Sequence, residues 1–183
     1  LIAANLRAPF TGVAPVLEQI IAHFNLTASQ AGFITTLPLI AFAVISPMAA
    51  SLAKRQGLER TLFFAVFLIL LGIAARVVNS SIMLFVGTAI IGAGIAIANV
   101  LLPSIIKRDF AAKVAVMTSA YVLTMGIASG GFSALVYPLS QYKGLGWEFA
   151  LGASALITIT TLIVWMAQLN KHTKPAQTAQ AST

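Results

Sequence analysis

One charged side chain lies in the middle of the first apolar segment, and its position suggests solute binding. Arg7 stands eleven residues before Glu18, so about 16 Å of helix would separate it from the polar end of the segment. That depth is near the midplane of a hydrocarbon core about 30 Å thick, where an arginine costs about 2.5 to 3.5 kcal/mol or more. We expect Arg7 either to have a permanent partner, with Asn5, Thr11 and Glu18 as candidates, or to bind anionic or dipolar solutes through its paired donors.

Other polar or soft side chains within apolar segments are candidates for the same site. Asn99 is the polar exception in its segment, and it is expected to contact either solute or a neighbouring helix. Tyr121 and Met125 belong to a series at steps of three or four, which projects from one side of a helix; solute contact and ordinary packing both fit. The candidate substrate-binding residues are therefore Arg7, Asn5, Thr11, Asn99, Tyr121 and Met125.

The remaining titratable residues are too few and too scattered for catalysis. The chain has 4 acidic residues, 2 histidines and no cysteine, and Glu18, Glu59, Asp109 and Glu148 fall at the ends of different segments. No two carboxylates are expected in one buried site, and neither a metal site nor a nucleophile triad is visible in the sequence. We therefore expect no enzyme activity, no cofactor and no metal.

The elements that must position these residues are membrane helices. The chain of 183 residues is 59% hydrophobic and 8% charged, with a mean hydropathy of +0.96, which excludes an ordinary soluble domain. Cutting at charged and turn-forming clusters predicts six spanning helices at about 1–22, 30–53, 61–78, 82–106, 114–139 and 148–169. We expect residues 1–169 to form one all-α bundle of six transmembrane helices and residues 170–183 to form a polar cytoplasmic linker or tail.

The basic residues predict how this bundle sits in the membrane. The net charge of +7 arises from bases in the gaps between apolar segments and not on a polar face, so nucleic acid is not an expected partner. With alternating helices, Lys54, Arg55, Arg60, Lys107, Arg108, Lys113, Lys171 and Lys174 share one side, while Lys143 and Arg76 belong to the other. The positive-inside rule makes the first side cytoplasmic, with both ends of the chain there. Because Leu1 would then lie inside the bilayer, we expect further residues upstream.

Small residues predict where helices approach closely. Gly87 and Gly94 belong to a series of small residues in the fourth segment that favours close packing. Gly126, Gly130 and Gly131 predict either a second close-packing face or a flexible point in the fifth. Prolines within or at the ends of the spans predict bent helices around a cavity.

Several short motifs are spread along the chain. They include Asn5-Leu6-Arg7, Thr35-Thr36-Leu37-Pro38-Leu39, Gly57-Leu58-Glu59-Arg60, Gly92-Ala93-Gly94-Ile95-Ala96, Asn99-Val100-Leu101-Leu102-Pro103 and Ile106-Lys107-Arg108-Asp109-Phe110. Together these motifs resemble the cyanate and 2-nitroimidazole transporter family of the major facilitator superfamily, nearest its 2-nitroimidazole branch. The resemblance extends over nearly all of the span from Asn5 to Trp147 and is most specific between Asn99 and Phe110.

The resemblance implies the N-terminal six-helix half of an inner-membrane secondary transporter that works by alternating access. Its expected partners are a small-molecule solute, the lipid bilayer, and either the missing C-terminal half or a second copy of this half. The superfamily's gating loop, Gly-x-x-x-Asp-Arg-x-Gly, aligns here with Arg55 and Gly57 matching and with Lys54 in the place of the acid. Glu59 is the local substitute for that acid, and Arg60 completes the gating set.

The expected function is transport of a small polar, anionic or nitro-heteroaromatic solute such as cyanate or a 2-nitroimidazole. No phosphate-binding loop is present, so an ion or solute gradient and not ATP would drive it. A channel and a non-transporting structural membrane subunit are the alternatives.

Overall fold

A computed structural model describes residues 1–144 and 146–167 of the chain. Within these ranges all regular structure is helical: α1 (Ile2–Asn5), α2 (Ala8–Thr11), η1 (Ala14–Val16), α3 (Leu17–Phe24), α4 (Ala28–Gln56), α5 (Leu58–Arg76), α6 (Ser81–Asp109), η2 (Ala111–Lys113), α7 (Val114–Gln141), η3 (Tyr142–Gly144), α8 (Gly146–Gly152) and α9 (Ser154–Met166). Five stretches, namely α4, α5, α6, η2 with α7, and α8 with α9, are long and apolar enough to cross a membrane. The predicted tail at 170–183 lies outside the described residues.

The first segment is broken, and the prediction of one continuous helix over 1–22 is wrong. Proline has no N–H to donate, and its ring collides with the carbonyl group four residues earlier. The break at 6–7 precedes Pro9, and the break at 12–13 precedes Pro15. The prolines of α4, α6 and α7 leave their helices continuous. Interruption is thus confined to the first segment, where it releases backbone carbonyl groups inside the bundle.

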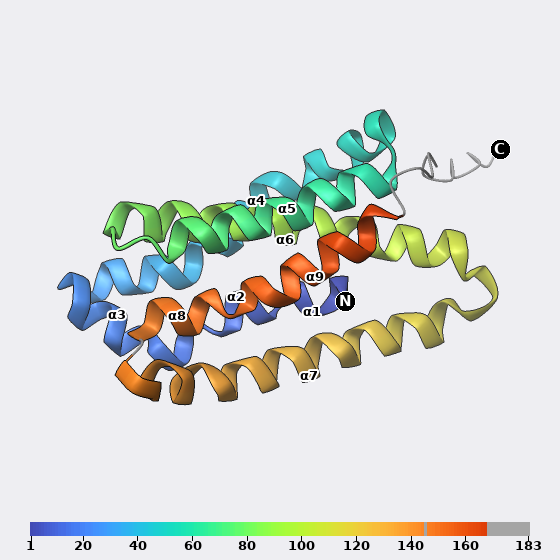
Figure 1. The fold of residues 1–183 in the computed structure, drawn as a ribbon. Helices are drawn as coiled ribbons and strands as arrows, with labels where there is room; N and C mark the ends of the chain where they lie inside the picture. Colours follow the sequence, from blue (N-terminus) through green and yellow to red (C-terminus); the bar gives the residue numbers. More distant parts are fainter. Residues whose placement is uncertain (145, 168–183) are drawn as a thin grey trace.

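The helix α6 packs closely against α4 and α5, and these three lie together along one side of the bundle (Figure 1). A methyl group placed on Gly87 would lie 2.6 Å from the carbonyl oxygen of Gly72, and one placed on Gly94 would lie 2.6 Å from that of Ala65. Only glycine allows the two backbones to come so near, and the predicted close packing in this helix is confirmed.

The glycines of α7 differ from those of α6. A methyl group on Gly126, Gly130 or Gly131 would meet no atom within 4 Å in the described part of the chain. The described residues therefore provide no partner for the second close-packing face that was expected here. Many apolar side chains of α4 and α7 are also exposed, so much of the surface of these two helices is uncovered by other described residues.

The short helices α1 and α2 run through the middle of the bundle, in contact with α7, α9 and α6 (Figure 1). One apolar cluster, which includes Leu62 and Leu101, packs near the Gly57 turn. A second, which includes Ile20 and Leu84, packs near the opposite end. Leu6, in the first break, belongs to the first cluster, and Val13, in the second break, belongs to the second cluster. The cavities described below lie beside these two breaks.

Candidate functional site

A cavity of about 390 Å³ lies beside the break at 6–7, and we name it the central cavity. Four elements line it, namely the first segment, α4, α6 and α7. Among the described residues Arg7 is its one charged lining residue, so this lining carries a positive charge and no carboxylate. Its walls are formed by Leu6, Arg7, Phe10, Thr11, Pro38, Leu39, Phe42, Gly92, Ile95, Asn99 and Met125.

The Arg7 side chain is exposed and has no hydrogen-bond or ion-pair partner among the described residues. Thr11 Oγ1 does lie 3.1 Å from Arg7, but it donates to the backbone carbonyl oxygen and not to the guanidinium group. Neither Asn5 nor Glu18 contacts that group. The expectation of a permanent partner within the first segment is therefore wrong, and the five N–H donors of Arg7 remain available to a solute.

Three further predicted residues line the same cavity. Thr11 Oγ1 lies 3.1 Å from Ser129 Oγ, which links α2 to α7. Asn99 donates from Nδ2 to the Ile95 carbonyl oxygen at 3.0 Å within its own helix, so the alternative of an interhelical hydrogen bond is not found among the described residues. Met125 contributes an apolar, polarisable wall. Arg7, Thr11, Asn99 and Met125 thus come together around one space, although they are spread over nearly 120 residues of sequence.

Asn5 and Tyr121 are placed elsewhere. Asn5 is buried against α9, where its Nδ2 donates to Thr161 Oγ1 at 2.8 Å and its Oδ1 accepts from Thr158 Oγ1 at 2.6 Å. This is a link between the first and last membrane segments. Tyr121 is half-buried on α7 and does not line the cavity.

A second cavity of about 380 Å³ adjoins the first, toward the end of the bundle that holds α3, and we name it the distal cavity. Phe10, Thr11 and Pro38 line both cavities. The distal lining adds Val13, Ala14, Ile34, Thr35, Arg76, Thr88, Ile91, Ser129, Gly130 and Ser133. Arg76 is 1% exposed and donates from Nη2 to the Pro9 carbonyl oxygen at 2.9 Å.

Arg76 was expected on the side of the membrane away from most of the other bases, but its side chain is buried inside the bundle. A signal is present in the sequence, because Arg76 directly follows the uninterrupted apolar run of its segment, and two valines follow it. In the structure Arg76 is the last residue of α5, and its side chain points into the bundle. A second arginine therefore contacts the first segment.

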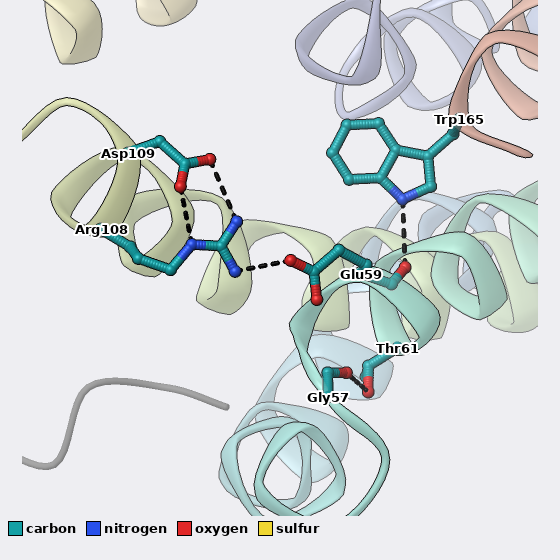
Figure 2. Close-up of polar contacts among 6 residues, drawn as sticks. All are labelled: Gly57, Glu59, Thr61, Arg108, Asp109 and Trp165. Atoms are coloured by element: carbon teal, nitrogen blue, oxygen red, sulfur yellow. Dashed lines mark hydrogen bonds and ion pairs between the residues drawn. The ribbon is translucent and has the colours of Figure 1, made fainter. Parts of the chain in front are cut away.

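The predicted gating residues Arg55, Gly57, Glu59 and Arg60 lie at the other end of the bundle, and one of them, Glu59, belongs to a charged cluster (Figure 2). Arg108 Nη1 lies 2.6 Å from Glu59 Oε1, while its Nε and Nη2 donate to the two carboxylate oxygens of Asp109 at 2.7 and 3.1 Å. Trp165 Nε1 donates to the Glu59 carbonyl oxygen at 3.0 Å. The Glu59 side chain is 4% exposed, so this cluster ties the start of α5 to the ends of α6 and α9.

The other three gating candidates have different surroundings. Gly57 has φ 91° in the single-residue turn between α4 and α5, a conformation that favours glycine, and its carbonyl oxygen accepts from Thr61 Oγ1 at 2.7 Å. Arg55 lines a groove of about 390 Å³ between α4 and α5. Arg60 is exposed, and neither of these arginines contacts a carboxylate in the described residues.

Known proteins share this sequence pattern over most of the chain. Residues 2–182 match the model of the Major Facilitator Superfamily. The chain is 51% identical over 168 residues to the 2-nitroimidazole transporter of Escherichia coli (strain K12), covering 92% of this chain and 42% of that protein. It is 40% identical over 177 residues to the uncharacterized transporter YycB of Bacillus subtilis (strain 168), covering 97% and 44%, and 25% identical over 166 residues to the cyanate transport protein CynX of Escherichia coli (strain K12), covering 90% and 43%.

The chain spans less than half the length of these relatives. Their names describe transporters and not enzymes, in agreement with the expectation from the sequence. The predicted family resemblance and the all-α membrane fold are confirmed by the match and by the apolar helices.

Proposed function

Because the chain belongs to the Major Facilitator Superfamily, we propose that it forms the N-terminal part of a secondary transporter for a small polar, anionic or nitro-heteroaromatic solute. Such a solute would bind in the central cavity, and the rest of the protein would cover the exposed apolar side chains of α4 and α7. Cyanate and 2-nitroimidazole are the first solutes to test, since two relatives bear those names.

The observation that carries this proposal is that the guanidinium group of Arg7 has no partner, and its cavity no acidic lining residue, among the residues that the structure describes. A charge within a membrane protein is retained at a cost, and its usual use is to bind solute or ions. Planar oxygen pairs, as in a nitro group, fit the forked donors of arginine. Thr11 and Asn99 add polar contacts, while Met125 suits an apolar ring.

Alternating access follows from the same arrangement. In a carrier, solute moves when two states of the protein bind it from opposite sides. The broken first segment supplies short helices that can tilt separately near the solute. The charged cluster around Arg108 supplies contacts at the end of the bundle that holds the Gly57 turn, where solute would enter or leave. A gradient of ions or solute would drive the cycle.

The membrane orientation is part of the proposal. Within the described residues, Lys54, Arg55, Arg60, Lys107, Arg108 and Lys113 lie at the end of the bundle that holds the Gly57 turn. By the positive-inside rule this end faces the cytoplasm of a bacterial inner membrane, and the distal cavity opens toward the other side.

The test is uptake by liposomes that contain the purified full-length protein, with radiolabelled 2-nitroimidazole and cyanate as probes. We expect saturable uptake and counterflow for the wild type and for the control Lys113→Ala, which removes an exposed positive charge far from the cavities. Arg7→Ala should abolish both while leaving the thermal unfolding midpoint in detergent unchanged.

Each other result contradicts a named part of the proposal. Unsaturated conductance would indicate a channel, and absence of flux for both probes from a folded wild type would reject these two solutes and favour a structural subunit. Normal counterflow by Arg7→Ala would remove Arg7 from the site.

A further inference from the structure

The distal cavity combines a buried cation with several hydroxyl groups and an aromatic side chain. Within the described part of the chain, Arg76 is the one charged residue that lines it, and no carboxylate does. The hydroxyl-bearing residues are Thr11, Thr35, Thr88, Ser129 and Ser133, and Phe10 supplies an aromatic wall. A volume of about 380 Å³ lies in the range of small-molecule binding sites.

The guanidinium group of Arg76 is only partly satisfied. Its one hydrogen bond with a described residue joins Nη2 to the Pro9 carbonyl oxygen, and its buried Nε has no partner there. A guanidinium group has five N–H donors, and a buried charge without a counter-ion is strongly unfavourable. An arginine that ends a membrane helix can extend its head outward to water, yet Arg76 turns inward and is 1% exposed.

The contact with Pro9 explains only part of this arrangement. The break at 12–13 releases the Pro9 carbonyl group, because Val13 N donates to the Phe10 carbonyl oxygen and not to that of Pro9. A single hydrogen bond to one carbonyl oxygen needs neither a positive charge nor a forked donor. Arg76 also lines the distal cavity, and no other cation is found in that lining among the described residues.

We propose that Arg76 forms a second solute-binding position, which takes small planar solutes with a carboxylate or nitro group. The proposal rests on the proposed transport function and adds a step to it. Phe10, Thr11 and Pro38 line both cavities, so a solute that leaves Arg76 reaches Arg7 without leaving the protein. A solute that enters from the side of the membrane away from the Gly57 turn then meets Arg76 before Arg7. A solute that leaves toward that side meets Arg76 last.

The experiment uses solute protection of single cysteines. The 183 residues of this chain include no cysteine, and any cysteine in the rest of the full-length protein is first replaced by serine. Ser133→Cys reports on the distal cavity and Met125→Cys on the central cavity, each in the full-length protein. Labelling of the introduced thiol by N-ethylmaleimide is measured in membranes with increasing 2-nitroimidazole. We expect protection at both positions when Arg7 and Arg76 are intact.

The arginine variants separate the two positions. Arg76→Gln should raise the 2-nitroimidazole concentration for half-protection at position 133 by about tenfold or more, with a smaller change at position 125. Arg7→Gln should give the reverse pattern. Arg76→Lys keeps a positive donor for the Pro9 carbonyl oxygen but loses the planar fork, so it should fold and still weaken protection at position 133.

A comparison of probes keeps the proposal testable if the Arg76 variants fail to fold. With Arg76 intact, imidazole lacks the nitro oxygens and should protect position 133 at least about tenfold less well than 2-nitroimidazole. Equal protection by the two probes, or unchanged protection in a folded Arg76→Gln protein, would overturn the proposal. Protection at position 125 alone would reject the distal position while supporting the transport function, whereas no protection at either position together with no uptake would reject both.

Discussion

Two regions of the bundle use the same residue types in opposite ways. In the pair α5 and α6, glycines meet backbone atoms of the other helix, and Arg108 meets two carboxylates. Along the first segment and α7, the α7 glycines meet nothing within the described chain, and Arg7 meets no carboxylate. The first region is a packed frame in which the charge of Arg108 is neutralised, whereas the second has empty space beside the α7 glycines and an Arg7 side chain without an acidic partner among the described residues. Solute binding requires empty space and free N–H donors, because an arginine whose donors are all hydrogen-bonded cannot bind a solute.

The largest expected effect on stability comes from adding one methyl group to the frame. Gly87→Ala would place Cβ 2.6 Å from the Gly72 carbonyl oxygen and 2.7 Å from Arg76 N, so α5 and α6 must separate. We expect a loss of about 3 kcal/mol of stability, the upper part of the range for overpacking. The measurement is the thermal unfolding midpoint of the full-length protein in detergent.

The matched control is Gly126→Ala on α7, where the added methyl group meets nothing within 4 Å. Alanine is the better helix former by about 1 kcal/mol, so stability should stay unchanged or rise slightly. A loss as large as that of Gly87→Ala would mean that this part of α7 is tightly packed in the full-length protein, and the contrast between the two regions would fail.

The second effect tests whether paired charges stabilise the frame. Glu59→Gln replaces a carboxylate that is 4% exposed and 2.6 Å from Arg108, whereas Asp109→Asn replaces one that is 42% exposed. A hydrogen bond between charged groups contributes about 2 kcal/mol when buried, while an exposed ion pair contributes about 0 to 1 kcal/mol. We expect Glu59→Gln to lower the unfolding midpoint clearly and Asp109→Asn to lower it little; equal losses would argue against burial as the cause.

Much of the frame was predictable from sequence, because length, hydropathy and small-residue spacing are local signals. The predicted segments at 61–78 and 82–106 agree with α5 and α6 to within a few residues, and the close packing at Gly87 and Gly94 follows from residue size alone. The central cavity was partly predictable, since Arg7 and Asn99 are polar residues in apolar surroundings. Apolar neighbours in the sequence therefore identify individual polar residues as candidates, but they do not show which candidates lie together.

What each unusual residue faces was not predictable, because it depends on how helices rotate about their axes. Asn5 and Arg7 are two residues apart, yet one is buried against α9 and the other is open to the cavity. The break at 6–7 separates their directions, and its position depends on Pro9. Arg76 was missed for a related reason: a base at the end of a span normally points to water, and only the three-dimensional position of the Pro9 carbonyl group shows that it points inward.

The smallest expected effects distinguish these two directions within the first segment. Asn5→Leu removes two hydrogen bonds to α9, and we expect a loss of about 1 kcal/mol of stability.

Thr11→Val keeps the shape of a residue that lines both cavities but removes its hydroxyl group, so it should weaken 2-nitroimidazole binding about fivefold with little loss of stability. Unfolding midpoints and half-protection concentrations measured on the same two variants separate stability from affinity. If Asn5→Leu weakened binding more than Thr11→Val, the side of the first segment that faces α9 would be the solute-binding side, because direct contact with the solute should outweigh an effect transmitted through helix packing.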